Sequence, residues 1–170
     1  MSNIDNSASL TTATTGTPPG TPTATEDKLA VVETLYRYAA GLDLRDKNLL
    51  TSAFADDAVA DFGPATKKAG QEYPPVKGSE TIAAALLGSL SHLDTTHSLS
   101  NPRVSLDGDT AHLEGIMACQ HLPREDHSRH VLMTNRYEVD LARQGEVWVI
   151  QHVTVDNAWT EGDPTVLSGI

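Results

Sequence analysis

The sequence has little positive charge and no long apolar run. Its 12 Lys and Arg residues stand against 23 Asp and Glu residues, which gives a formal net charge of −11. Nucleic acids and anionic membranes favour clustered Lys and Arg, so this balance argues against both as partners. No stretch is apolar and long enough to cross a bilayer.

Cysteine is almost absent as well. Cys119 is the only one among the 170 residues, so no disulfide can form within the chain. It lies in an apolar run, which predicts a buried, unreactive thiol and fits a reducing compartment. The first 26 residues have neither the basic nor the apolar region of a secretory signal. We therefore expect a cytoplasmic protein.

Several motifs that mark common active sites are also missing. The sequence contains no glycine-rich phosphate loop, no GxSxG nucleophile elbow, no HExxH and no paired CxxC. The histidine-rich stretch HLPREDHSRH is typical of a polar hairpin tip that faces water. We therefore predict no metal site and no cofactor.

Composition divides the chain into a tail, one domain and a short end. Residues 1–24 are mostly Ser, Thr, Pro, Gly and Ala, which bury too little surface to offset the entropy of ordering, so they predict a disordered tail. The domain is expected over 25–162, with a C-terminal tail at 163–170. The sequence TATE at 23–26 fits a capping box that starts a helix.

Helical periodicity predicts three helices before residue 94. Asp46 is placed to cap a short helix at 47–54, and Ser79 to cap another at 79–93. Gly41 is expected to loosen the last turn of the first helix. That helix should bury residues that recur at three- and four-residue steps, namely Leu29, Val32, Leu35, Tyr36, Ala39 and Leu42.

Strand patterns occupy most of the remaining sequence. Ala58–Phe62 alternates like a strand, and 65–78 is a loop rich in Pro and Gly. Short turns separate four further strands, which predicts an antiparallel meander. These lie at 95–108, 110–123, 129–142 and 146–159.

The element order predicts an α+β fold with a curved, mostly antiparallel sheet and helices on its concave face. Such layers enclose a cone-shaped cavity where small ligands bind. A partly apolar outer face of the sheet predicts a homodimer or homotrimer.

Two polar residues stand at positions that predict burial. Asp43 follows Ala39 by four residues, so it continues the apolar stripe if the helix persists. His97 shares a strand face with Thr95 and Leu99. An inward carboxylate can hold an imidazole N–H and stabilise the imidazolium, which makes the histidine a general base. From the residues alone, Asp43 could equally cap a helix, and His97 could be a hydrogen-bonded core residue.

Other polar side chains share parity with apolar neighbours on the later strands. His121 falls on the face of Met117 and Cys119, Asn135 on that of Met133, and His152 on that of Trp148 and Ile150. Each can be a satisfied buried polar group. Together they indicate a polar-lined cavity.

The stretch LYRYAAGLDLRDKNLLTSAFADDAVADFGP resembles the opening of the SnoaL-like branch of the NTF2-like (cystatin-like) superfamily. The branch has Tyr-x-x-x-x-Asp, Asp-x-x-x-Leu and Phe-x-x-Asp-Ala, and this sequence has Tyr38 with Asp43, Asp46 with Leu50, and Phe54 with Asp57–Ala58. The later THSLSNPRVSLDGDTA also resembles that branch. The resemblance covers roughly residues 26–160 and implies the cone-shaped fold.

Within the branch, the sequence resembles the scytalone dehydratase, bile acid 7α-dehydratase and lindane dehydrochlorinase families. These are cofactor-free lyases in which an aspartate orients a histidine that abstracts a proton. The resemblance implies catalytic roles for Asp43, His97 and Tyr38. It further implies a substrate-binding set of Phe62, His121, Met133, Asn135, His152 and Trp159.

The match has departures that leave the substrate open. Leu42 and Phe62 stand where scytalone dehydratase has tyrosines, and Met133 stands where it has a serine. The resemblance therefore implies a dehydratase, dehydrohalogenase or isomerase acting on a small hydrophobic cyclic substrate. A non-catalytic small-molecule-binding or assembly module is an alternative, as is a polyketide cyclase or epoxide hydrolase.

Overall fold

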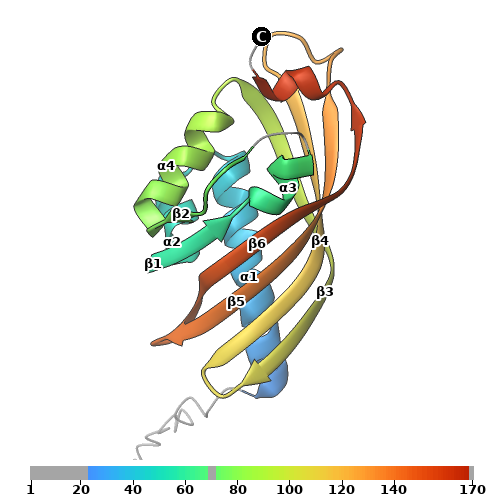
Figure 1. The fold of residues 1–170 in the computed structure, drawn as a ribbon. Coiled ribbons are helices and arrows are strands. Elements are labelled where there is room, and N and C mark those ends of the chain that lie inside the picture. The colour runs from blue at the N-terminus through green and yellow to red at the C-terminus, as the bar shows by residue number, and fades with distance from the viewer. Residues whose placement is uncertain (1–22, 69–71, 169–170) are drawn as a thin grey trace, which may run out of the picture.

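The computed structural model describes residues 23–68 and 72–168, so nearly all of the predicted tail at 1–24 lies outside the described residues. The chain forms a mixed α+β fold around a six-stranded curved sheet (Figure 1). Its elements in chain order are α1 (Ala24–Asp43), α2 (Lys47–Ser52), β1 (Phe54–Asp61), α3 (Gly63–Lys68), β2 (Val76–Lys77), α4 (Ser79–Ser89), β3 (Leu93–Asp107), β4 (Thr110–Pro123), β5 (Val131–Gln144), β6 (Val147–Gly162) and the 3-10 helix η1 (Pro164–Ser168).

The sheet has the strand order β2-β1-β6-β5-β4-β3. All neighbours pair antiparallel except β1 and β6, which run parallel. Figure 1 shows α1 lying behind the long strands and α4 beside the edge formed by β1 and β2. The predicted α+β class, the mostly antiparallel curved sheet and the four-strand meander are confirmed.

Helix α1 begins at the predicted capping box, in which the Thr23 hydroxyl accepts from the Glu26 N–H and the Glu26 side chain accepts from the Thr23 N–H. Its buried face, however, is rotated from the predicted one. Leu29 and Tyr36 are 66 % and 51 % exposed, so their predicted burial is wrong. Thr34 is buried instead, because its hydroxyl donates to the Trp148 carbonyl of β6 at 2.9 Å.

Gly41 sets the distance between the first two helices. A Cβ atom there would lie 2.6 Å from the backbone N and Cα of Leu50, so only glycine allows this close approach. The helix continues past Gly41 to Asp43, in contrast to the predicted loosening. Asp46 caps α2 as predicted, since its carboxylate accepts from the Leu49 N–H at 3.0 Å.

The segment predicted as a loop contains two further elements, α3 and the two-residue strand β2, which pairs with β1. Helix α4 starts one residue earlier than the predicted cap implies. Its N-cap is Gly78, with φ of 91°, and Ser79 is its buried first residue. The prediction that Ser79 caps this helix is wrong.

An irregularity in the β5–β6 ladder decides which β6 side chains face inward. Asp140 pairs with His152 and Leu141 with Ile150, so Gln151 is an extra residue in β6. Beyond it, the residues that face inward and outward are exchanged. His152 is therefore exposed, and Val153 is buried. The prediction that His152 shares the inner face with Trp148 and Ile150 is wrong.

Residues 163–168, predicted as a tail, pack against the domain. They include η1, whose Val166 side chain is 2 % exposed and whose Val166 carbonyl contacts the His92 ring at 3.1 Å. Within the described residues, no helix combines the length and the apolar character that a membrane span needs.

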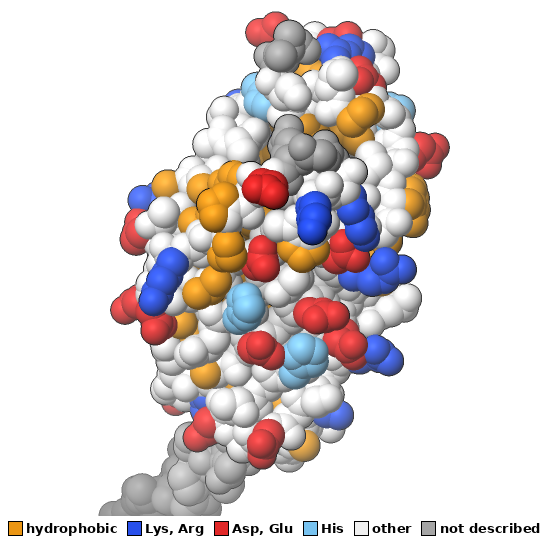
Figure 2. Space-filling model, in the orientation of Figure 1, with side chains coloured by type: hydrophobic (Ala, Val, Ile, Leu, Met, Phe, Trp, Pro, Cys, Tyr) orange, Lys and Arg blue, Asp and Glu red, His pale blue; other side chains and the backbone are white. Residues whose placement is uncertain are grey.

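Figure 2 shows charged and histidine side chains spread over the region of β5 and β6. Exposed residues of this face include Glu138, Asp140 and His152, beside the part-buried Ile116 and Ala118. The homodimer or homotrimer predicted from a partly apolar outer face stays a prediction.

Candidate functional site

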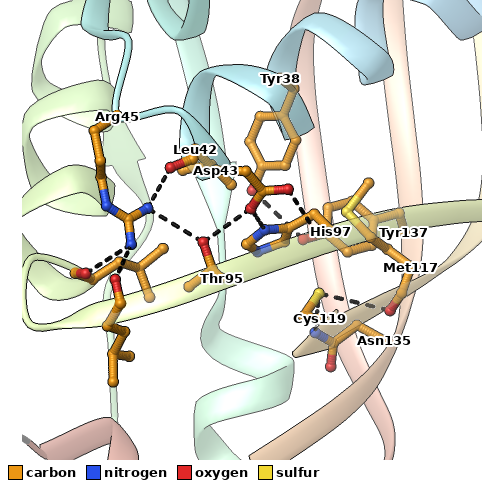
Figure 3. A network of polar contacts seen from close by, with 12 residues as sticks. Tyr38, Leu42, Asp43, Arg45, Thr95, His97, Met117, Cys119, Asn135 and Tyr137 are labelled. Atoms are coloured by element: carbon orange, nitrogen blue, oxygen red, sulfur yellow. Dashed lines mark hydrogen bonds and ion pairs between the residues drawn. The ribbon is translucent and has the colours of Figure 1, made fainter. Parts of the chain in front are cut away.

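Asp43 and His97 meet between the end of α1 and strand β3 (Figure 3). The His97 Nδ1 lies 2.7 Å from the Asp43 Oδ1. The other carboxylate oxygen accepts from the His97 backbone N–H at 2.8 Å, and the Thr95 hydroxyl donates to Oδ1 at 2.9 Å. Asp43 reaches β3 because it is the last residue of α1, where the helix no longer shields its side chain.

Both members of the pair have shifted acidity. Partial burial acts to raise the pKa of the Asp43 carboxyl, but the hydrogen bonds from His97 and Thr95 outweigh it and lower the pKa. Burial acts to lower the pKa of the His97 imidazole, but contacts with Asp43 and Cys119 outweigh it and raise the pKa to about 9. The free protein at pH 7 therefore holds an imidazolium–carboxylate pair.

His97 lines a cavity of about 330 Å³ between the sheet and the helices. On the sheet side of the cavity, Cys119, His121 and Asn135 lie beside His97. The opposite side is mostly apolar, with Thr66 and Ser89 as polar members, and its apolar residues come from α4, from the end of β1 and from η1. It includes Phe62, Ile82, Ala85, Leu86, Leu90 and Leu167.

His121 lies next to His97 in this cavity, with ring centroids 5.8 Å apart in an edge-to-face arrangement. Burial and the neighbouring His97 lower the pKa of His121 to about 4, so this ring is neutral at pH 7. Its Nδ1 is buried and has no hydrogen-bond partner within the described part of the chain. His121 can therefore offer a neutral hydrogen-bonding group to a ligand.

Tyr38 also lines the cavity, and its ring packs edge-on against Phe54 and Tyr137. Its hydroxyl lies 3.5 Å from that of Tyr137. Burial raises the pKa of both phenols, so both stay protonated at neutral pH. Tyr38 and Asp43 reach the same region although α1 is helical through both, because Asp43 extends from its last turn.

The predicted substrate-binding residues divide into two groups. Phe62, His121, Met133 and Asn135 line the cavity. His152 and Trp159 do not belong to its lining, and both are exposed. A second register shift in β5–β6, next to Asn135, places Trp159 opposite Thr134 and turns it outward. The sequence gives no sign of these shifts, because alternation alone assigns each strand residue its face.

Sequence reasoning missed several contributors to the site, among them Thr95, Cys119 and Leu167. Thr95 holds Asp43, and its place on the face of His97 was a signal for this role. Cys119 lines the cavity, where the sequence predicted only an unreactive buried thiol. Leu167 lines it from the segment predicted as a tail, and nothing in the local sequence indicated this.

Comparison with known proteins gives a consistent result. The family model described as the SnoaL-like domain matches residues 23–154. A curated protein described as Terrestric acid biosynthesis cluster protein E, from Penicillium crustosum, is 25 % identical over 150 residues, which cover 82 % of this chain and 88 % of that protein.

Solved structures with this fold include one described as a dehydrochlorinase and one described by the name of a dehydratase. One is hexachlorocyclohexane dehydrochlorinase LinA-type3 from Novosphingobium barchaimii, with 18 % identity, a TM-score of 0.66 and coverage of 81 % of this chain and 90 % of that one. The other, from Novosphingobium aromaticivorans, is assigned as a scytalone dehydratase, with 14 % identity, a TM-score of 0.69 and coverage of 81 % and 87 %. At these identities the likeness is one of fold.

Proposed function

The chain belongs to the SnoaL-like domain family, and we propose that it is a cofactor-independent lyase or isomerase that uses Asp43 and His97 to move a proton on a small hydrophobic cyclic substrate. Elimination of water or halide is the specific reaction we favour. The observation that carries this proposal is that His97, held by its hydrogen bond to Asp43, lines a largely apolar cavity.

The pair has the geometry of an oriented base. Asp43 holds His97 Nδ1, so Nε2 is the ring nitrogen left to reach a ligand in the cavity. In an elimination, neutral Nε2 takes a proton from the carbon next to the leaving group. The C–H electron pair then forms the double bond, and the leaving group departs as halide, or as hydroxide that becomes water by taking up a proton from the His97 imidazolium. Asp43 stabilises the imidazolium that this step creates.

The lining supports a neutral substrate. The described residues around the cavity include no Lys and no Arg, and the positive charge of His97 is already paired with Asp43. A carboxylate or phosphate ligand would therefore lose its hydration with little compensation. The volume of about 330 Å³ lies near the lower end of the range for ligand pockets, which favours a substrate of one or two rings.

Tyr38, His121 and Asn135 supply the polar contacts such a substrate needs. Protonated Tyr38 can donate to a departing hydroxyl or halide, and neutral His121 can accept from or donate to a ring substituent. All three line the same cavity as His97. The relative from a Penicillium biosynthesis cluster adds support for a substrate drawn from secondary metabolism.

A non-catalytic ligand-binding role is the second candidate, and the charge state of His97 favours it. With a pKa of about 9, the imidazole is about 1 % neutral at pH 7, so few free molecules hold the base form. The neutral fraction grows about tenfold per pH unit up to about pH 9, so the catalytic role predicts a rate that rises with pH over this range.

A substrate screen separates the two candidates. Cyclic alcohols, β-hydroxy ketones and cyclic halides are incubated with the protein, and elimination is followed by absorbance and mass spectrometry. We expect a turnover that His97→Ala abolishes and that His112→Ala, a change in an exposed histidine also paired with an aspartate, leaves intact. Full activity in His97→Ala shows that His97 is not the base. Binding without turnover across the screen supports the second candidate.

A further inference from the structure

Arg45 occupies a backbone position where an arginine is unusual. Its φ is 58°, in the left-handed region that favours glycine. Helix α1 ends in a Schellman motif, in which the Arg45 N–H donates to the Leu42 carbonyl at 3.3 Å and the Asp46 N–H to the Gly41 carbonyl at 3.0 Å. Glycine would serve this turn with less strain, so the arginine side chain has a reason to be there.

The Arg45 side chain forms hydrogen bonds to three elements, α1, α4 and β3. The Arg45 guanidinium donates to the Leu42 carbonyl of α1, to the Leu90 carbonyl at the end of α4 at 3.0 Å, and to the Leu93 carbonyl at the start of β3 at 2.5 Å. Two of these carbonyls lie at helix C-termini, where partial negative charge favours a cation. The same guanidinium donates to the Thr95 hydroxyl at 3.3 Å.

Thr95 connects Arg45 to the carboxylate of the site, as Figure 3 shows. Because its oxygen accepts from Arg45, its single O–H proton is directed to the Asp43 Oδ1, at 2.9 Å. The same oxygen of Asp43 contacts His97 Nδ1. A chain of contacts therefore runs from Arg45 through Thr95 and Asp43 to the imidazole.

We propose that Arg45 is a positioning residue that fixes Asp43 against His97, both through Thr95 and by holding the end of α1 to β3 and α4. The catalytic part of this inference rests on the proposed function. The positioning part is independent of the proposed function, because it concerns the protonation of the His97 ring in the protein without substrate.

The chain offers a matched control in Arg37. Its guanidinium also donates to two backbone carbonyls, those of Ser52 and Trp148, at 2.6 and 2.7 Å, and to the Thr34 hydroxyl at 3.1 Å. It thus matches Arg45 in its bonds to carbonyls and to a threonine hydroxyl, and it adds an ion pair with Glu33 at 3.0 Å, but it makes no bond to the residues of the site. Removing either arginine leaves backbone carbonyls unpaired, so both changes should lower stability.

The experiment compares Arg45→Met with Arg37→Met in the full chain, with folding checked by circular dichroism. The His97 ring nitrogens are followed by ¹⁵N NMR as the pH is raised. We expect the pKa of His97 to fall by about one unit in Arg45→Met, a tenfold loss of proton affinity, and to stay unchanged in Arg37→Met. Thr95→Val should reproduce the effect, and the Arg45→Met/Thr95→Val double variant should add little to either single change.

Once a substrate is known, Arg45→Met should lower kcat about tenfold with little change in KM when the rates are measured above pH 9, where His97 is neutral in both proteins, whereas Arg37→Met should alter neither. A folded Arg45→Met protein with an unchanged His97 titration overturns the proposal. If Arg45→Met does not fold, Arg45→Lys and Thr95→Val decide in its place, and unchanged titration in both overturns it. If the protein proves inactive on every substrate, the NMR result still tests the positioning role by itself.

Discussion

Two histidine–aspartate pairs in this molecule have the same contact distance in different surroundings. His97 Nδ1 lies 2.7 Å from Asp43 Oδ1, and His112 Nδ1 lies 2.7 Å from Asp140 Oδ1. The side chains of the first pair are 5 % and 22 % exposed, and those of the second are 44 % and 61 % exposed. Bond length alone therefore does not distinguish a candidate active site from a surface contact.

The surroundings create the difference in chemistry. The outer pair joins β4 to β5 on the solvent side of the sheet, where water and salt screen the attraction. The inner pair has less water around it, so each hydrogen bond and charge acts more strongly. Asp43 also accepts from Thr95 and from the His97 backbone N–H, which fixes its carboxylate.

Of the changes that test the contrast between the two pairs, Asp43→Asn should have the largest effect. The amide keeps the shape of the side chain but loses the charge that stabilises the imidazolium, so we expect the rate constant kcat to fall about 100-fold or more. The matched change Asp140→Asn should leave kcat within about twofold. Steady-state kinetics on a substrate from the screen measures both. Equal effects of the two changes would falsify the assignment of Asp43 to the reaction.

The pH dependence of the reaction should be the next largest effect. A base must be neutral to accept a proton, and the pKa of free His97 is about 9. The value of kcat/KM should therefore rise about tenfold per pH unit from pH 7 and level off near pH 9. A value that instead declines over this range would identify the imidazolium as a general acid. His112→Ala should show the wild-type profile.

The sequence predicted much of this fold because its local signals agree with the tertiary structure. The capping box at Thr23–Glu26, the Asp46 cap and the alternation in β3 and β4 depend on near neighbours in the chain. Alternation also placed His97 and Thr95 on one face. Only the family resemblance predicted that Asp43 contacts His97, which lies 54 residues later in the chain.

What the sequence could not predict depends on distant contacts. The buried face of α1 includes Thr34, whose hydroxyl bonds to the carbonyl of Trp148 in β6, 114 residues away, as well as to the nearby Ala30 carbonyl. The outward positions of His152 and Trp159 result from shifts in register with a neighbouring strand. The roles of Arg45 and Leu167 likewise depend on elements that meet only in the folded chain.

Folding stability should also separate the two pairs, through its change with pH. The folded pKa of His97, about 9, exceeds its ordinary value of 6.5, so protonated His97 stabilises the fold fully below pH 6.5. This stabilisation is lost as the pH rises to 9, at a cost of up to about 3 kcal/mol. Urea unfolding from pH 6 to 10 should show the loss in the wild type but not in His97→Gln. Identical curves for the two proteins would contradict the raised pKa.

Breaking the outer pair should have the smallest effect. His112 and Asp140 are exposed, and exposed ion pairs contribute only about 0.2–1 kcal/mol, because solvent screens them and the side chains lose freedom. His112→Ala should therefore lower the free energy of unfolding by less than about 1 kcal/mol, and 1 M NaCl should remove most of that difference. Urea unfolding at low and high salt measures this. A larger loss of unfolding free energy that persists in 1 M NaCl would show that the outer pair stabilises the fold as strongly as the inner pair. Burial would then no longer explain the difference between the two pairs.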